Sequence, residues 1–192
     1  GLPVALAMSL WLGYLAVLLG REQRRREALL PLGVLLAVLA YLAAYFWDYH
    51  RPEHHPPPCM DGTKVLPVSG QVIAMAWGIS AAPLWPLAAL GVLLPVCYLL
   101  GRMWRDHLSI PARWGVLAVI VGQLGLAVAI GIARGGFGAD MGLWSRYSLL
   151  IWPLAGLGYL MAVRYGQRRA TVALCLAAAL FFPGNMIQGL YY

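Results

Sequence analysis

Charged residues are scarce in this chain of 192 residues, and their scarcity excludes an ordinary soluble protein. Only 11% of the residues are charged, whereas about 25% are charged in a typical soluble domain. Hydrophobic residues make up 61% of the chain, and the mean hydropathy is +0.73. The net charge of +7 does not indicate a nucleic-acid partner, because the charges form short clusters beside apolar runs, as membrane topology requires.

The apolar runs contain no histidine, lysine, aspartate or glutamate. This absence excludes a haem held between helices and a retinal Schiff base. It also disfavours an ion-coupled transporter, which usually keeps a charged residue inside the membrane. The chain has no P-loop, HExxH or serine nucleophile elbow, and its three cysteines form no CxxC pair. We therefore expect no cofactor.

Six apolar runs are each long enough to cross a bilayer, whose hydrocarbon core needs roughly 20 apolar residues in helix. They predict an all-α polytopic membrane protein with six transmembrane helices. The expected spans are residues 2–20, 28–47, 84–100, 114–133, 147–163 and 170–190. The chain begins inside an apolar run and ends without a polar tail. We therefore expect one helical domain, residues 1–192, that is a fragment of a longer protein.

The run at residues 65–101 is too long for one crossing and barely long enough for two. Pro83 and Pro86 lie inside it, and proline removes a backbone donor and disfavours helix in the preceding residue. We expect a single crossing at 84–100. It would be preceded by an interfacial or re-entrant helix over residues 71–80.

Positive charge predicts the orientation of the chain. Ten of the fourteen arginines and lysines lie in the loops at 21–27, 102–113 and 164–169. The positive-inside rule puts these loops in the cytoplasm and both chain ends outside. Two crossings at 65–101 would move later loops to the other side and abolish this asymmetry. We expect a bacterial inner-membrane protein whose partner is the lipid bilayer, with no nucleic-acid partner.

The loop after the second span is rich in metal-ligand residue types, but its prolines argue against a metal site. Pro52, Pro56, Pro57 and Pro58 forbid a helix that would align histidines on one face. We expect an extended surface loop and no metal. The candidate ligands are His50, His54 and His55. If the protein is an enzyme, the acid/base candidates are Asp48, His50 and His54.

The loop between the fourth and fifth spans is rich in glycine, which allows a ligand to approach the backbone closely. Gly135, Gly136 and Gly138 can present successive N–H groups to an anion. Arg134 and Arg146 flank these glycines and suit bidentate binding of phosphate or carboxylate. These five residues form the predicted anion-binding site.

Arg146 also begins the fifth predicted span, where the helix dipole disfavours a cation. We expect a carboxylate to compensate, and Asp140 or Asp48 is the natural partner. A purely structural ion pair is therefore the alternative to an anion site at Arg146.

Two stretches resemble elements of uncharacterised multi-pass bacterial membrane proteins. One contains a Tyr-Phe-x-x-Tyr run that leads to Pro-x-His-His-Pro, at residues 45–56. The other contains Arg-x-Gly-x-Gly at 134–138 and Ser-Arg-Tyr at 145–147. A more distant likeness is to bacterial membrane-embedded sugar transferases that use lipid-linked donors. The acidic pair in the first outer loop of those enzymes is not seen here.

These observations support an outer-face pocket that recognises an anionic headgroup, such as a lipid-linked phosphate or sugar-phosphate. The likeness to sugar transferases implies a part in glycan transfer. A second hypothesis is a non-catalytic scaffold or complex subunit with other membrane proteins as partners, and a third is a transporter.

Overall fold

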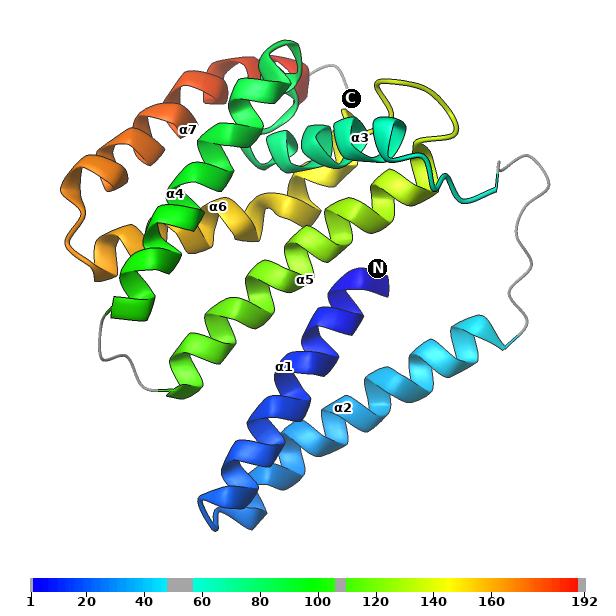
Figure 1. The fold of residues 1–192 in the computed structure, drawn as a ribbon, viewed down its shortest axis with the longest axis vertical. Coiled ribbons are helices and arrows are strands. Elements are labelled where there is room, and N and C mark those ends of the chain that lie inside the picture. Colours follow the sequence, from blue (N-terminus) through cyan, green and yellow to red (C-terminus); the bar gives the residue numbers. More distant parts are fainter. Residues whose placement is uncertain (1, 48–56, 106–109, 190–192) are drawn as a thin grey trace. The chain divides into compact units, whose positions relative to one another are not determined.

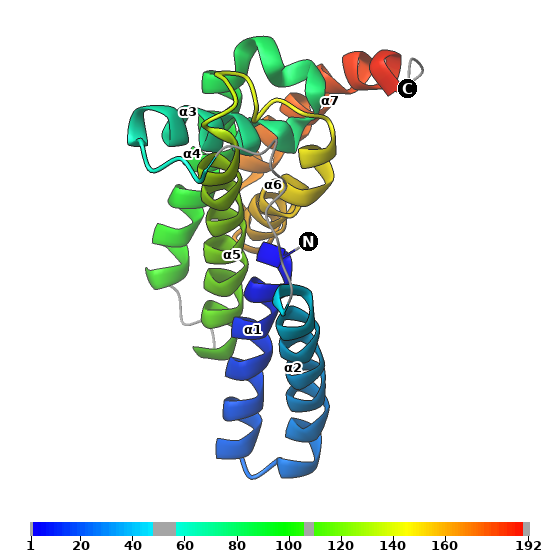
Figure 2. The ribbon, with the colours of Figure 1, turned by 90° about the vertical axis from the view of Figure 1, so that its right-hand side faces the viewer.

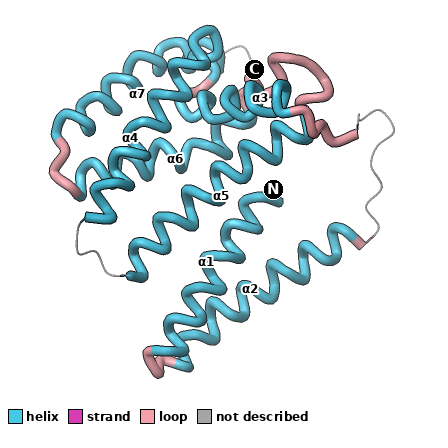
Figure 3. Tube along the Cα trace, viewed as in Figure 1, coloured by secondary structure: helices cyan, strands magenta, loops and turns pink. Residues whose placement is uncertain are grey.

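The computed structural model describes residues 2–47, 57–105 and 110–189. In this part of the chain every regular element is a helix (Figure 3). The α-helices are α1 (Leu2–Arg21), α2 (Arg25–Phe46), α3 (Gly62–Ala74), α4 (Trp85–Arg105), α5 (Ile110–Arg134), α6 (Arg146–Arg164) and α7 (Arg168–Gly189) (Figure 1). Two 3-10 segments, η1 (Met75–Trp77) and η2 (Ile79–Leu84), connect α3 to α4.

Five helical stretches are long and apolar enough to cross a membrane. They are Arg25–Ala44, Ile79–Arg105, Arg113–Arg134, Arg146–Arg164 and Arg168–Gly189. The all-helical prediction is confirmed, and five of the six expected spans coincide with these stretches. The first expected span coincides with α1, in which Trp11–Arg21 is a shorter apolar stretch.

The exposed side chains of α7 show why such a helix suits lipid. Leu176, Leu180, Phe182 and Ile187 are exposed, whereas Leu174 is buried. A helix that is apolar on all sides belongs in a core or a membrane.

The chain divides into two compact units, one formed by residues 1–55 and 108–125 and the other by 56–107 and 126–192. In the first unit, α1 and α2 form a hairpin through a turn in which Gln23 has a φ of 61°. The rings of Tyr14 and Trp114 lie 6.1 Å apart. A Cβ on Gly115 would collide with the ring of Trp11. These contacts tie the N-terminal part of α5 to α1.

The second unit contains the most deeply buried side chains of the described residues. α3 and η1 pack against α4 and α6, and α6 packs against α7. Figure 2 shows the same unit from the side, with α3 at the end where α6 begins. The largest fully buried side chains are Met75, Leu99, Met103, Ile151, Leu154, Val68, Val72 and Val92.

The short helix before α4 differs from the one predicted over residues 71–80. It begins nine residues earlier, at Gly62, and ends at Ala74, where η1 begins. Asp61 caps its N-terminus by accepting a hydrogen bond from Thr63. The prediction followed hydropathy alone and did not use this cap, which sets where the helix starts.

The break before α4 lies between Pro83 and Pro86, because α4 begins at Trp85. Gly78, between η1 and η2, has a φ of 90°, which favours glycine. The side chain of Asn185 in α7 binds this bend at two points. Its Nδ2 donates to the carbonyl of Trp77 over 2.7 Å, and its Oδ1 accepts from the N–H of Ser80 over 3.0 Å.

Candidate functional site

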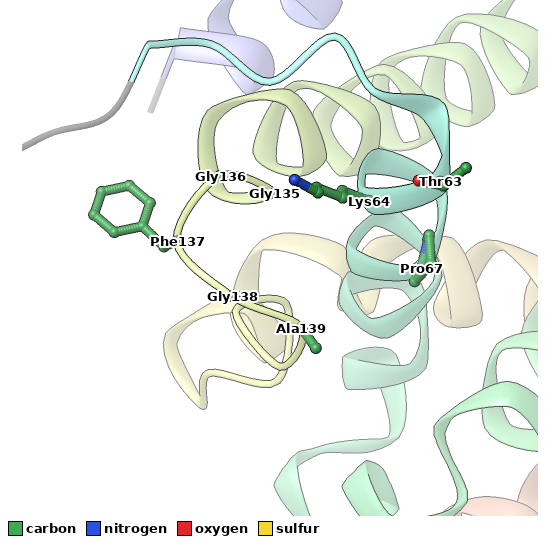
Figure 4. Close-up of a pocket in the computed structure, with 8 residues that line it drawn as sticks. All are labelled: Thr63, Lys64, Pro67, Gly135, Gly136, Phe137, Gly138 and Ala139. Carbon is green, nitrogen blue, oxygen red and sulfur yellow. The ribbon is translucent and has the colours of Figure 1, made fainter.

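A pocket of about 320 Å³ lies between the first turns of α3 and the glycine-rich loop that follows α5 (Figure 4). The side chain of Lys64 extends from α3 toward Gly135 and Gly136 (Figure 4). Lys64 is the only lysine in the chain. The residues that line the pocket are Thr63, Lys64, Pro67, Gly135, Gly136, Phe137, Gly138 and Ala139.

The N-cap of α3 fixes Lys64 in the first turn of the helix. The Asp61 carboxylate accepts hydrogen bonds from the Thr63 hydroxyl at 2.6 Å and the Thr63 N–H at 2.9 Å. Both bonds lower the pKa of Asp61, and the bond from the Thr63 hydroxyl has the largest effect. The nearby charge of Lys64 lowers this pKa further. Asp61 is therefore an ionised cap at neutral pH, and its carboxylate is a poor proton acceptor there.

A close backbone approach holds the start of α3 against the end of α5. The N–H of Cys59 donates to the carbonyl of Ile132 over 2.8 Å. Gly131 faces α3 so closely that a Cβ there would lie 2.7 Å from the carbonyl oxygen of Val65 and would also meet Ser69. Only glycine fits this crossing without a shift of one helix, and the crossing brings the loop after α5 beside Lys64.

Gln71 fixes the far side of the loop. Its side chain is buried, with 2% of its surface exposed. Nε2 donates to the carbonyl of Ala139 over 2.7 Å, and Oε1 accepts from the N–H of Gly142 over 3.1 Å. A Cβ on Gly142 would collide with the carbonyl of Val68. The loop is therefore anchored to α3 by one amide that uses both its donor and its acceptor.

Among the described residues, three that line the pocket have a backbone N–H group without a hydrogen-bond acceptor. The N–H of Gly135 donates to Gly131, and that of Phe137 donates to Arg134. Within the described residues, the N–H groups of Gly136, Gly138 and Ala139 have no hydrogen-bond acceptor. Unpaired N–H groups beside an ammonium suit an anion. Gly135, Gly136 and Gly138 all line the pocket, and their role in binding an anion stays a prediction.

Neither predicted arginine lines this pocket. The Arg134 guanidinium lies 5.1 Å from the ring centre of Phe137, and the ring points away from Lys64 (Figure 4). The guanidinium of Arg146 lies 4.2 Å from the ring centre of Trp144 and 5.3 Å from that of Tyr147.

Arg146 has aromatic neighbours where a carboxylate was expected. The ion pairs among the described residues join Arg24 to Glu22 and Glu27, and none joins Arg146 to Asp140. An aromatic face offers a cation partial negative charge, which offsets the unfavourable helix dipole at the start of α6. The other expected partner, Asp48, lies outside the described residues.

The acid/base candidates Asp48, His50 and His54 and the candidate metal ligand His55 also lie outside the described residues. Within the described part of the chain, no group of three or more His, Cys, Asp or Glu side chains could hold a metal ion.

Sequence reasoning missed Lys64 and Gln71. A signal for Lys64 was present, because Asp61-Gly62-Thr63 before an apolar run is typical of a helix start. That pattern places Lys64 in a first turn. No local pattern reveals that Gln71 binds a loop about 70 residues away, since this contact depends on how α3 and α5 pack. Comparison with known protein families, curated proteins and solved structures gives no significant match.

Proposed function

We propose that this chain is embedded in a membrane and binds the anionic headgroup of a lipid in the Lys64 pocket. The supporting observation is that the only lysine of the chain extends toward Gly135 and Gly136. These glycines belong to a loop in which the N–H groups of Gly136, Gly138 and Ala139 have no acceptor among the described residues. Lys64 and these three residues all line one pocket of about 320 Å³. That volume is at the lower end of the range for small-molecule sites, about 300–1,000 Å³.

Energetics favour an anion over a neutral ligand at this pocket. A hydrogen bond to a charged group stabilises a complex by about 1.5–3 kcal/mol, against about 1 kcal/mol for a neutral one. The N–H groups are fixed before binding, because Gln71 and the Gly131 crossing hold the loop. Because the donors are already fixed, less conformational entropy is lost when the ligand binds.

The distribution of charge favours an outward position for the pocket. In the second unit, Tyr98 near the end of α4 donates a hydrogen bond to Gln167 in the α6–α7 turn, over 3.2 Å. Five arginines gather at that end: Arg102, Arg105, Arg164, Arg168 and Arg169. The pocket end carries Lys64, Arg134 and Arg146, balanced in part by Asp61 and Asp140. By the positive-inside rule, the arginine-rich end faces the cytoplasm.

In this proposal the chain lies in a bacterial inner membrane with six crossings and both ends outward. The segment α3–η1–η2 is a re-entrant element, covered by protein as irregular backbone at membrane depth must be. Its residues 71–77 are all buried. The pocket then lies near the outer headgroups, where a lipid-linked phosphate or sugar-phosphate can enter it for glycan transfer.

Lipid binding by the purified protein in detergent tests the proposal. Native mass spectrometry would compare binding of phosphatidylglycerol, which is anionic, with phosphatidylcholine, which has no net charge. Lys64→Gln should weaken phosphatidylglycerol binding by about 10-fold or more, the loss of one charge-assisted hydrogen bond. Arg168→Gln removes a cation at the other end and should leave binding unchanged. Equal affinities of wild type and Lys64→Gln would contradict the proposal and favour the scaffold hypothesis.

A further inference from the structure

We infer that the Lys64 pocket selects a singly charged phosphodiester over a doubly charged phosphate monoester. This inference rests on the proposed function and narrows its ligand. It follows from the charges at the pocket, where the lining residues supply one positive charge to the ligand and the Asp61 carboxylate lies within electrostatic reach of that charge.

Lys64 is the only charged side chain among the residues that line the pocket. The nearest arginine in sequence, Arg134, lies over the Phe137 ring, and this ring points away from Lys64 (Figure 4). Arg146 lies over Trp144 and does not line the pocket. A bound anion therefore meets one ammonium and a set of neutral N–H donors.

Two carboxylates adjoin the lining residues. Asp61 caps α3 three residues before Lys64, and the lysine charge helps to lower the pKa of this carboxyl. Asp140 follows Ala139, the last lining residue of the loop, and is exposed. Among the lining residues a second negative charge on the ligand would meet no further cation, and the Asp61 carboxylate, which interacts with the Lys64 charge, would repel it. Like charges at contact distance in water cost about 1 kcal/mol, which corresponds to about a 5-fold loss in affinity.

The number of donors also suits a phosphodiester. Such a group has two unsubstituted oxygens that share one charge, and each oxygen accepts several hydrogen bonds. The ammonium and the N–H groups of Gly136, Gly138 and Ala139 are enough to satisfy both oxygens. A phosphate monoester presents a third free oxygen and, above its second pKa of about 6, a second charge.

The test compares two lipids with the same acyl chains across pH. Phosphatidylglycerol carries a phosphodiester, and phosphatidic acid carries a phosphate monoester. At pH 8 the wild-type protein should bind phosphatidylglycerol about 5-fold more tightly. Near pH 5.5 the two affinities should approach each other, because phosphatidic acid is then mostly a monoanion. Tighter binding of phosphatidic acid at pH 8, or a ratio that does not change with pH, would overturn the inference.

Asp61→Asn provides a second measurement. Asparagine caps helices as well as aspartate does, so α3 should keep its start, while one repelling charge is removed. The preference for phosphatidylglycerol at pH 8 should shrink in this variant, and an unchanged preference would contradict the role given to Asp61.

Water-soluble analogues show whether the ligand is a lipid or a free anion. Together with Lys64→Gln, they also test the proposed function separately from the selectivity. Glycerophosphoglycerol and glycerol 3-phosphate should show the same ranking at lower affinity. Soluble compounds that bind as tightly as the lipids would identify a free anion as the ligand and overturn the lipid source. Lipid binding that is insensitive to Lys64→Gln would refute the proposed function itself, whereas Lys64-dependent binding with the opposite preference would refute only the selectivity.

Discussion

The side-chain amide of Gln71 donates a hydrogen bond to the carbonyl of Ala139 over 2.7 Å. Through this bond, and a second from the N–H of Gly142 to the same amide, the core of α3 holds one wall of the pocket. The other wall is the first turn of α3 itself, which carries Lys64. One helix therefore supplies both the cation and the anchor of the loop that faces it.

Replacing Gln71 by Met should destabilise the fold and weaken anion binding together. Methionine has a similar length but leaves the buried Gly142 N–H without a partner, at a cost of about 1–3 kcal/mol. It also removes the hydrogen bond to the Ala139 carbonyl. Thermal unfolding in detergent measures the loss. Gln188→Met, on an exposed part of α7, is the control and should change neither property. A stable Gln71→Met variant with full lipid affinity would show that the loop does not need this anchor.

Gly142→Ala should also destabilise the protein, because the new methyl group would collide with the Val68 carbonyl and with Gln71. Overpacking of this kind costs about 1–3 kcal/mol. Gly101→Ala in α4 is the matched control, since nothing lies within 4 Å of a Cβ there. The control should be neutral or slightly stabilising, because alanine favours helix more than glycine does. Similar melting temperatures for the two variants would contradict the packing described here.

Asn185→Leu tests the bend between η1 and η2. The substitution removes the side-chain oxygen that accepts from the Ser80 N–H and the side-chain nitrogen that donates to the Trp77 carbonyl. We expect a loss of about 1–3 kcal/mol in the free energy of unfolding, together with faster hydrogen exchange at Ser80. Slow exchange at Ser80 in the variant would show that the bend is stable without the Asn185 side chain.

Asp61 should make the start of α3 sensitive to acid. Its pKa is lowered from the ordinary value of 3.8, first by the Thr63 hydroxyl. A carboxyl with a lowered folded pKa contributes stability above its unfolded pKa, and the contribution is lost as the pH falls through the folded value. Thr63→Val removes the hydroxyl bond, so it should raise the pKa of Asp61 toward 3.8 in a carbon-13 NMR titration. An unchanged pKa would mean that the hydroxyl bond is absent in solution.

Much of the helical architecture follows from hydropathy, while the site does not. The expected break between Pro83 and Pro86 coincides with the start of α4 at Trp85, because proline acts on its immediate neighbours. The start of α3 was misplaced because the Asp61 cap is a polar signal outside the apolar run. Local rules therefore predict where helices break and begin, provided that both apolar and capping signals are used.

The sequence pointed to the glycines of the candidate site and not to its lysine. The glycines of the loop signalled an anion site through their backbone, and Gly135, Gly136 and Gly138 all line the pocket. The cation was assigned to the arginines beside them in sequence. Lys64, on a helix about 70 residues earlier in the chain, extends toward the loop. Arg134 lies over the ring of Phe137, and Arg146 lies over the rings of Trp144 and Tyr147. Which cation reaches the glycines depends on tertiary packing, which no spacing rule contains.

Thiol labelling in intact cells tests the orientation. Cys59 is partly exposed and precedes α3, while Cys97 and Cys175 lie within α4 and α7. An impermeant thiol reagent should label Cys59 from outside and leave the other two unmodified, because lipid covers them. Labelling of Cys59 only after permeabilisation would reverse the proposed orientation.

The most direct test of the central claim is an NMR titration of Lys64 itself. Reductive methylation with carbon-13 labels this single lysine, and the Lys64→Arg variant identifies its signal by loss. Addition of short-chain phosphatidylglycerol should shift the signal, because a bound phosphate accepts hydrogen bonds from the ammonium. Arg146→Gln should leave this shift unchanged. A Lys64 signal that does not move at lipid concentrations that saturate binding would contradict the assignment of this pocket as the anion site.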